Sequence, residues 1–195
     1  MKHPSNRDLF AYWTERRGAR LAPERGEIEP SEIRQVLGDT FVLASDGIPN
    51  HPFRLAGTRL CALFGRELKG ESFVKLWDRT DQAALRELIG VVMEEKVGVV
   101  ASASGFKADD DLLTINLELL LLPLAYRSKN DARVLGSLAP LAAPYWLGAR
   151  AIGPLRLGMF RHLGSGTALV APARFVAAAR RLKRGLTVYD GGRTD

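Results

Sequence analysis

The chain has 195 residues, of which 46% are hydrophobic and 26% charged, and its formal net charge is +6. These values are ordinary for one globular domain with attachments, and they exclude collagen-like, coiled-coil and wholly disordered chains. The single cysteine excludes an internal disulfide framework. The longest uncharged stretch, residues 134–149, is shorter than the roughly 20 residues of a membrane-spanning helix. We therefore expect a cytoplasmic protein.

Residues 1–38 are predicted to form an N-terminal helical cap. A capping pattern at the start favours a first helix, which places Leu9, Tyr12 and Trp13 on one face. A short second helix is expected after Pro30. Because exposed aromatic side chains need a cover, the face with Leu9, Tyr12 and Trp13 is predicted to be a dimer contact or a packing surface.

Residues 39–144 are predicted to form the core of the protein. Two short strands over 40–45 and 53–56 are followed by a clear amphipathic helix over 80–95. Three later strands are expected, over residues 97–106, 112–122 and 133–141. Apolar and polar residues alternate in the second of these, which is typical of an antiparallel sheet with unlike faces. This order predicts an α+β domain whose antiparallel sheet carries helices on one face.

Motifs that could carry chemistry are few. Residues 65–72 have the spacing of a phosphate-binding loop, but Glu71 stands where the lysine is needed, so a structural turn is favoured. The three histidines have no metal-ligand spacing. Cys61 lies in an apolar turn and is expected to pack in the core. No catalytic constellation is visible, and we do not expect an enzyme.

Glu118 is the most unusual polar residue, because it lies on the polar side of the leucine-rich strand. It could pair with an arginine of a neighbouring strand, Arg54 or Arg133, or it could contact a ligand. The structural pairing is favoured. An enzymatic activity, if the chain had one, would have to be an unrecognised reaction around Glu118.

Residues 145–195 form a predicted basic extension with nine basic and two acidic side chains, against 19 basic and 20 acidic in residues 1–144. A helix-prone segment over 172–184 carries the residues that could contact an anion: Arg174, Arg180, Arg181, Lys183 and Arg184. The apolar side of this segment is narrow and consists mostly of alanine. This favours docking on the body of the protein or on a second subunit. It could also bind anionic lipid or nucleic acid.

Several short patterns occur together in the order found in a known family. They are the segment FRLAGTRLCALFGRELKG over 53–70, Leu76-Trp77, a leucine-rich strand over 117–124, a strand over 133–138 and a final motif over 186–192. The chain therefore resembles the PAS domain superfamily, and most closely the stand-alone PAS-like family of alphaproteobacteria. The resemblance implies a five-stranded antiparallel sheet with helices on one face, in a protein that is commonly dimeric.

The resemblance also implies a role in sensing or protein interaction without a shared enzymatic activity. A ligand cavity of this family would lie between sheet and helices, and its position here would draw on Leu60, Phe64, Trp77, Leu88, Val92, Ile115, Leu117 and Leu119. The same residues would equally form a packed core. The cysteine motif of flavin-adduct photosensors is missing and no PAS-type haem histidine can be placed, so the sequence identifies no cofactor.

Together these observations predict a non-enzymatic, PAS-like sensory or regulatory module of bacterial signalling. We expect it to act by protein–protein interaction, as a homodimer and with a partner protein, and to be able to bind a small ligand. The alternative is a peripheral membrane or nucleic-acid adaptor that binds through the basic extension.

Overall fold

The computed structural model describes residues 1–44, 50–108, 110–125, 132–163 and 169–170. Its helices are α1 (Pro4–Arg17), α2 (Thr58–Phe64) and α3 (Gln82–Glu95), with single 3-10 turns at Arg25–Glu27, Leu37–Asp39 and Val74–Leu76. Its strands are β1 (Thr40–Ala44), β2 (Phe53–Ala56), β3 (Gly98–Lys107), β4 (Asp110–Pro123), β5 (Arg133–Pro140), β6 (Arg156–Leu163) and β7 (Leu169–Val170). None of the helices that the structure describes is long and apolar enough to cross a membrane.

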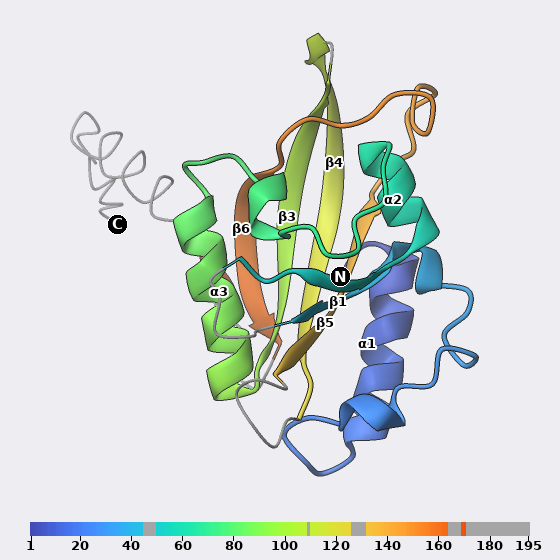
Figure 1. The fold of residues 1–195 in the computed structure, drawn as a ribbon. Coiled ribbons are helices and arrows are strands. Elements are labelled where there is room, and N and C mark those ends of the chain that lie inside the picture. The colour runs from blue at the N-terminus through green and yellow to red at the C-terminus, as the bar shows by residue number, and fades with distance from the viewer. Residues whose placement is uncertain (45–49, 109, 126–131, 164–168, 171–195) are drawn as a thin grey trace, which may run out of the picture.

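All strands belong to one antiparallel sheet with the order β2-β1-β5-β4-β3-β6-β7 (Figure 1). The predicted α+β class with an antiparallel sheet is confirmed, and the five strands expected from the sequence are present. The predicted number of five was wrong, because β6 and β7 extend the sheet to seven strands. Both come from the segment predicted as an extension, so the sheet continues beyond residue 144.

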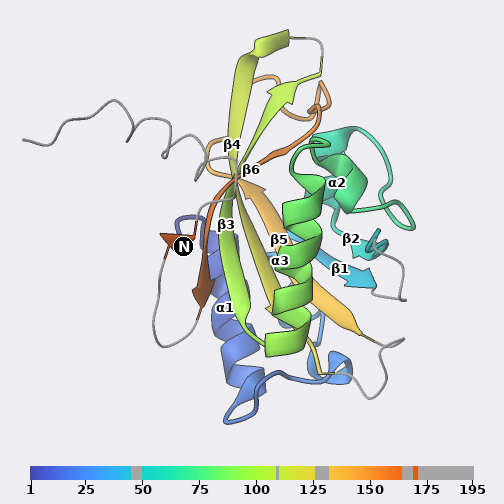
Figure 2. The ribbon, with the colours of Figure 1, turned by 90° about the vertical axis from the view of Figure 1, so that its left-hand side faces the viewer.

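The helices lie on both faces of the sheet, whereas helices on one face were expected. Figure 2 shows α1 on the opposite side of the sheet from α3. The physical reason lies in β4, where four consecutive leucines, residues 119–122, are all buried. Neighbouring residues of a strand point to opposite faces, so an unbroken apolar run needs a cover on each face.

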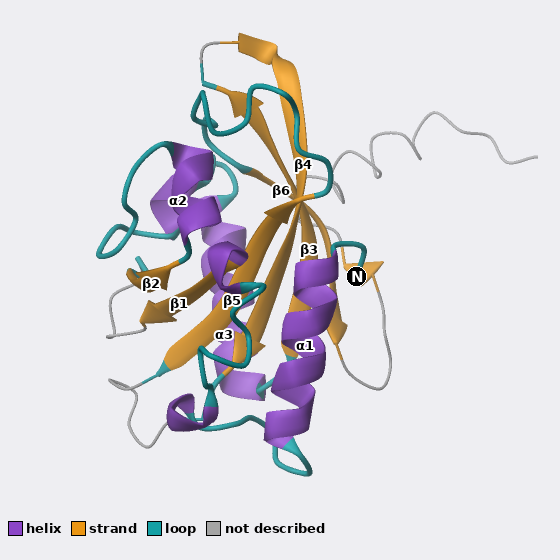
Figure 3. Cartoon of the chain, turned by 90° about the vertical axis from the view of Figure 1, so that its right-hand side faces the viewer, coloured by secondary structure: helices purple, strands orange, loops and turns teal. Residues whose placement is uncertain are grey.

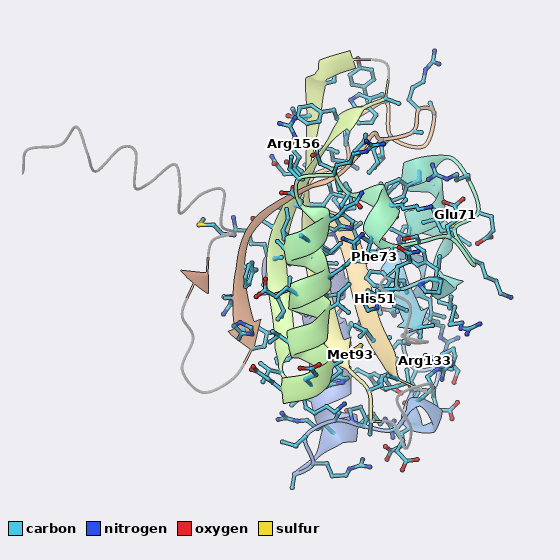
Figure 4. The ribbon with its side chains drawn as sticks, turned by 60° about the vertical axis from the view of Figure 1, so that its left-hand side comes forward. His51, Glu71, Phe73, Met93, Arg133 and Arg156 are labelled. Atoms are coloured by element: carbon cyan, nitrogen blue, oxygen red, sulfur yellow. The ribbon has the colours of Figure 1, made fainter. Side chains whose placement is uncertain are left out.

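The inner face carries the larger hydrophobic core, which α2 and α3 cover. In α3 the predicted apolar stripe is confirmed, because Leu85, Leu88, Ile89 and Val92 are its buried residues. An aromatic group lies beside them: the ring of Phe73 is 5.1 Å from that of Phe41 and 5.7 Å from that of Trp77. Phe73 and His51 lie on the α3 side of the sheet (Figure 4).

The outer face is covered by α1, which stands in front of the strands in Figure 3. Leu9 and Trp13 are buried there in a second cluster, together with Val42, Leu120 and Leu135 from three strands. The indole Nε1 of Trp13 also donates a hydrogen bond of 2.8 Å to the carbonyl of Pro123 at the end of β4. The N-terminal helix is therefore part of the fold.

Candidate functional site

The start of α1 is fixed to the sheet by Glu118 of β4. Its two carboxylate oxygens accept hydrogen bonds from the backbone amides of Lys2 at 2.7 Å and His3 at 2.9 Å. The side-chain amide of Asn6 donates a third, at 3.1 Å. Glu118 thus holds the entry to α1, and its partners are amide donors rather than the arginines proposed from the sequence.

Glu118 keeps its charge although only 7% of it is exposed. Burial alone would raise the pKa of this carboxyl group, but the hydrogen bonds from Lys2, His3 and Asn6 favour the ionised form. The net result is that the pKa of Glu118 lies below its ordinary value. An anion with these three donors is satisfied, which favours a structural role over one in acid–base chemistry.

A second polar connection joins α1 to α2 around the end of the sheet. Asp39 is buried immediately before β1, and its carboxylate pairs with Arg59 of α2 through two contacts of 2.8 Å, from Nε and from Nη2. The hydroxyl of Ser5 in α1 donates to the same carboxylate at 2.7 Å. Elements from both faces of the sheet therefore meet at one buried carboxylate.

A pocket of about 630 Å³ opens beside this ion pair. Its polar wall consists of His3, Ser5, Asp39 and Arg59. Its apolar wall comes from α2 and from the segment after β5, and includes Ala62, Leu63, Leu141, Ala142, Ala143 and Leu147. A concave site of this size, with an apolar wall and a few convergent polar groups, has the features of a small-molecule site.

The polar wall of the pocket was not predicted from the sequence. Asp39 is 20 residues from Arg59 and 34 from Ser5, so no local pattern joins them. The only available signal was that Arg59 falls within the segment that resembles other PAS domains.

The eight residues predicted to line an internal cavity lie together in one hydrophobic cluster, and the cavity itself stays a prediction. All eight are buried in the inner core, where they accompany the rings of Phe41, Phe53 and Phe73. The pocket at the ion pair lies at the rim of this core and shares none of the eight.

The predicted contact residues of α1 are engaged within the chain. Leu9 and Trp13 are buried against the sheet, and the hydroxyl of Tyr12 donates to the carbonyl of Glu27 at 3.3 Å and accepts from the amide of Glu29 at 2.8 Å. Of the two predicted roles for this face, a dimer contact or a packing surface, the contacts within the chain correspond to the packing surface. The five basic residues between Arg174 and Arg184 lie outside the described residues, so their contact with an anion stays a prediction.

The loop over 65–72 and Cys61, which the sequence singled out, make contacts that stabilise the fold. In the loop over 65–72, Arg66 pairs with Glu71 at 3.1 Å, and the carbonyl of Glu71 accepts from the amide of Phe53 at 2.9 Å. Cys61 packs against the inner core, and burial, with a smaller contribution from Glu67, raises the pKa of its thiol. Within the described part of the chain, no group of three or more His, Cys, Asp or Glu side chains is placed to hold a metal ion.

A shallow groove of about 300 Å³ runs over the outer face beside the start of α1. Its lining includes Val100 of β3, Met159 of β6 and Leu141 after β5. Met159 is 55% exposed, and Leu141 is also exposed. Here the outer face of the sheet is not covered by a helix that the structure describes (Figure 3).

A family model of the PAS domain matches residues 1–139 of the chain. The chain belongs to the PAS domain family. The match includes α1, which lies on the outer face, and it ends before β6. PAS domains are in general sensory and signalling modules, and typically they are not catalytic.

Among solved structures, this PAS domain is similar to a LOV protein of Rhodobacter sphaeroides, with 16% identity, a TM-score of 0.43, and coverage of 60% of this chain and 71% of that one. It is also similar to the PAS domain of an HTR-like protein from Haloarcula marismortui, with 18% identity, a TM-score of 0.36, and coverage of 56% and 89%. No curated protein matches the chain.

Proposed function

We propose that this PAS domain is a non-catalytic regulatory module of bacterial signalling that acts by protein–protein contact, and that it forms a homodimer. The observation that supports this proposal is the groove on the outer face, where exposed apolar side chains gather beside α1. Exposed large hydrophobic residues among the described ones are Leu21, Leu141, Tyr145 and Met159, and two of them line this groove.

The chemistry of the groove suits a protein partner. Met159 has a flexible, polarizable side chain of the kind that adapts to different apolar partners. Lys2 and Arg161 also line the groove, so the apolar strip has charged groups beside it. An apolar centre with polar surroundings is the usual composition of a protein interface.

The test is the molar mass of the full chain in solution, measured by light scattering after size-exclusion chromatography over a range of concentrations. We expect a dimer for the natural sequence and a shift towards monomer for Met159→Glu, because a charge would be buried in the contact. Leu21→Glu is the matched control, since Leu21 is 69% exposed and does not line the groove. A monomeric natural protein would overturn the homodimer, and a Met159→Glu variant as dimeric as the control would overturn the groove as its contact surface.

The alternative function, a peripheral membrane or nucleic-acid adaptor, rests on the charge of residues 145–195 in the sequence. The groove on the outer face supports the protein-interaction module, because the exposed apolar side chains of Leu141 and Met159 line it beside charged groups.

A further inference from the structure

The pocket beside Asp39 and Arg59 contains a guanidinium group that is already held in place. Arg59 uses Nε and Nη2 for Asp39, and Nη2 donates a further hydrogen bond of 3.0 Å to the carbonyl of Gln35. Nη1 has no hydrogen-bond partner among the described residues. The side chain is nevertheless 56% exposed. Arg59 therefore presents two unused N–H donors from a fixed position, which reduces the entropy cost of binding a ligand.

Glycine at position 38 is needed for this placement of Arg59. A Cβ atom on Gly38 would lie 2.7 Å from Cζ and 2.9 Å from Nη1 of Arg59, which is too close for any real side chain. The guanidinium lies directly against the backbone there. The position of Arg59 is thus set by its hydrogen bonds on one side and by the chain on the other.

His3 supplies a further donor to the same pocket. Its Nδ1 accepts a hydrogen bond of 3.2 Å from the amide of Ser5, so the proton of the neutral ring is on Nε2. The hydroxyl of Ser5 already donates its single proton to Asp39, so the donors left for a ligand are Nη1 of Arg59 and Nε2 of His3. Both oxygens of Asp39 are engaged by Arg59 and Ser5. The polar wall therefore offers donors, and it suits a ligand group that is an acceptor.

The opposite wall determines the rest of the ligand. Ala62, Leu63 and Leu147 present small or aliphatic side chains, and the segment 140–143 adds only proline, leucine and alanine. A bare inorganic anion would leave this wall in contact with water. A ligand with an apolar body covers this wall, and the removal of apolar surface from water favours its binding.

We propose that this pocket binds a small organic carboxylate with an apolar body, with its carboxylate at Nη1 of Arg59 and its body on the alanine and leucine wall. Because Asp39 neutralises the charge of Arg59, the pair has no net charge that would attract an anion from a distance. The affinity therefore comes from directed hydrogen bonds together with apolar contact. The proposal does not depend on the homodimer: the pocket shares Leu141 with the groove on the outer face, but Arg59 and Ala62 line only the pocket and Met159 lines only the groove.

Isothermal titration calorimetry of the full chain with octanoate, octanamide and inorganic phosphate tests the ligand class. We expect octanoate to bind at least roughly tenfold more tightly than octanamide, since a charge-assisted hydrogen bond to Arg59 is about twice as strong as a neutral one. Phosphate should give no measurable heat. Equal affinity for the acid and the amide, tighter binding of phosphate, or no heat with octanoate at millimolar concentration would each overturn the proposal.

Two variants locate the site. Ala62→Trp fills the pocket from an exposed position of α2 without removing a polar group, and we expect a loss of octanoate affinity of roughly tenfold or more. Arg59→Gln should reduce the preference for octanoate over octanamide. Ala83→Trp, at an exposed position of α3 outside the pocket, is the matched control. Unchanged octanoate binding by Ala62→Trp would place the ligand elsewhere and refute the assignment, even if Arg59→Gln failed to fold.

Discussion

Replacing Glu118 with alanine should release the start of α1 from the sheet. The change removes the acceptor of three hydrogen bonds, from the amides of Lys2 and His3 and from Asn6. Hydrogen bonds to a charged group contribute about 1.5–3 kcal/mol each. The two freed backbone amides can turn to water when the helix start loosens, so we expect a total loss of about 3 kcal/mol in the free energy of unfolding, which is less than the sum.

Urea unfolding followed by circular dichroism measures this loss directly. In a domain of this size 1 kcal/mol corresponds to about 2–4 °C in Tm, so Glu118→Ala should melt about 6–12 °C below the natural protein. Glu118→Gln should lose roughly half as much free energy, because it keeps one acceptor oxygen but directs an NH₂ group at N–H donors. Glu87→Ala, at an exposed position of α3, is the control.

The pH dependence of the same pair of proteins provides a second measurement. The pKa of Glu118 is lowered in the folded state, so its stabilising effect is present above the unfolded-state pKa and disappears as the pH falls through the folded-state value. The difference between the natural protein and Glu118→Ala should therefore shrink in acid. A Glu118→Ala protein within about 0.5 kcal/mol of the natural one at neutral pH would refute the role of this carboxylate.

Two further substitutions test the core. Gly136→Ala should cost about 2–3 kcal/mol in urea unfolding, because a Cβ there would lie 2.3 Å from the buried ring of Phe41; an unchanged stability would show that the ring can move. Burial, together with the charge of Arg86, lowers the pKa of His51, although a hydrogen bond with the backbone of Ala44 acts in the opposite direction. The unfolded chain therefore binds more protons than the folded one, and the free energy of unfolding should rise with pH across the range below about 6.5. His51→Asn, which also tolerates the left-handed φ of +43°, should flatten that rise, and an identical pH profile would contradict it.

Regular local patterns explain which parts of the fold could be predicted. The stripe of Leu85, Leu88, Ile89 and Val92 has helical spacing, and α3 contains these residues as its buried face. The leucines at 117, 119 and 121 alternate as expected for a strand and are buried in the inner core. In both cases the spacing within one element suffices, because it is set by the backbone geometry alone.

The candidate pocket could not be predicted, because it depends on contacts between distant segments. Asp39 is 34 residues from Ser5 and 20 from Arg59, and no local pattern in the sequence singles out any of the three. The strand β6 was also missed, since glycine at 158 and three charged or polar side chains hide its alternation. The reason for glycine at 158 is visible only in the folded protein, where β6 lies against β3. A Cβ atom on Gly158 would come within 2.2 Å of the hydroxyl of Ser102.

The position of β6 affects how the protein can be divided. The family match ends at residue 139, but β3 pairs with β6 along residues 98–104. A fragment that ended at the family boundary would leave this ten-residue strand as an open edge, with unpaired backbone donors and acceptors. It would also lose the buried side chains of Leu155 and Leu157 from the inner core. Such an edge is a template for pairing with other chains. The family match thus covers less of the chain than the sheet does, and we expect a fragment that ends at residue 139 to aggregate more readily than the full chain.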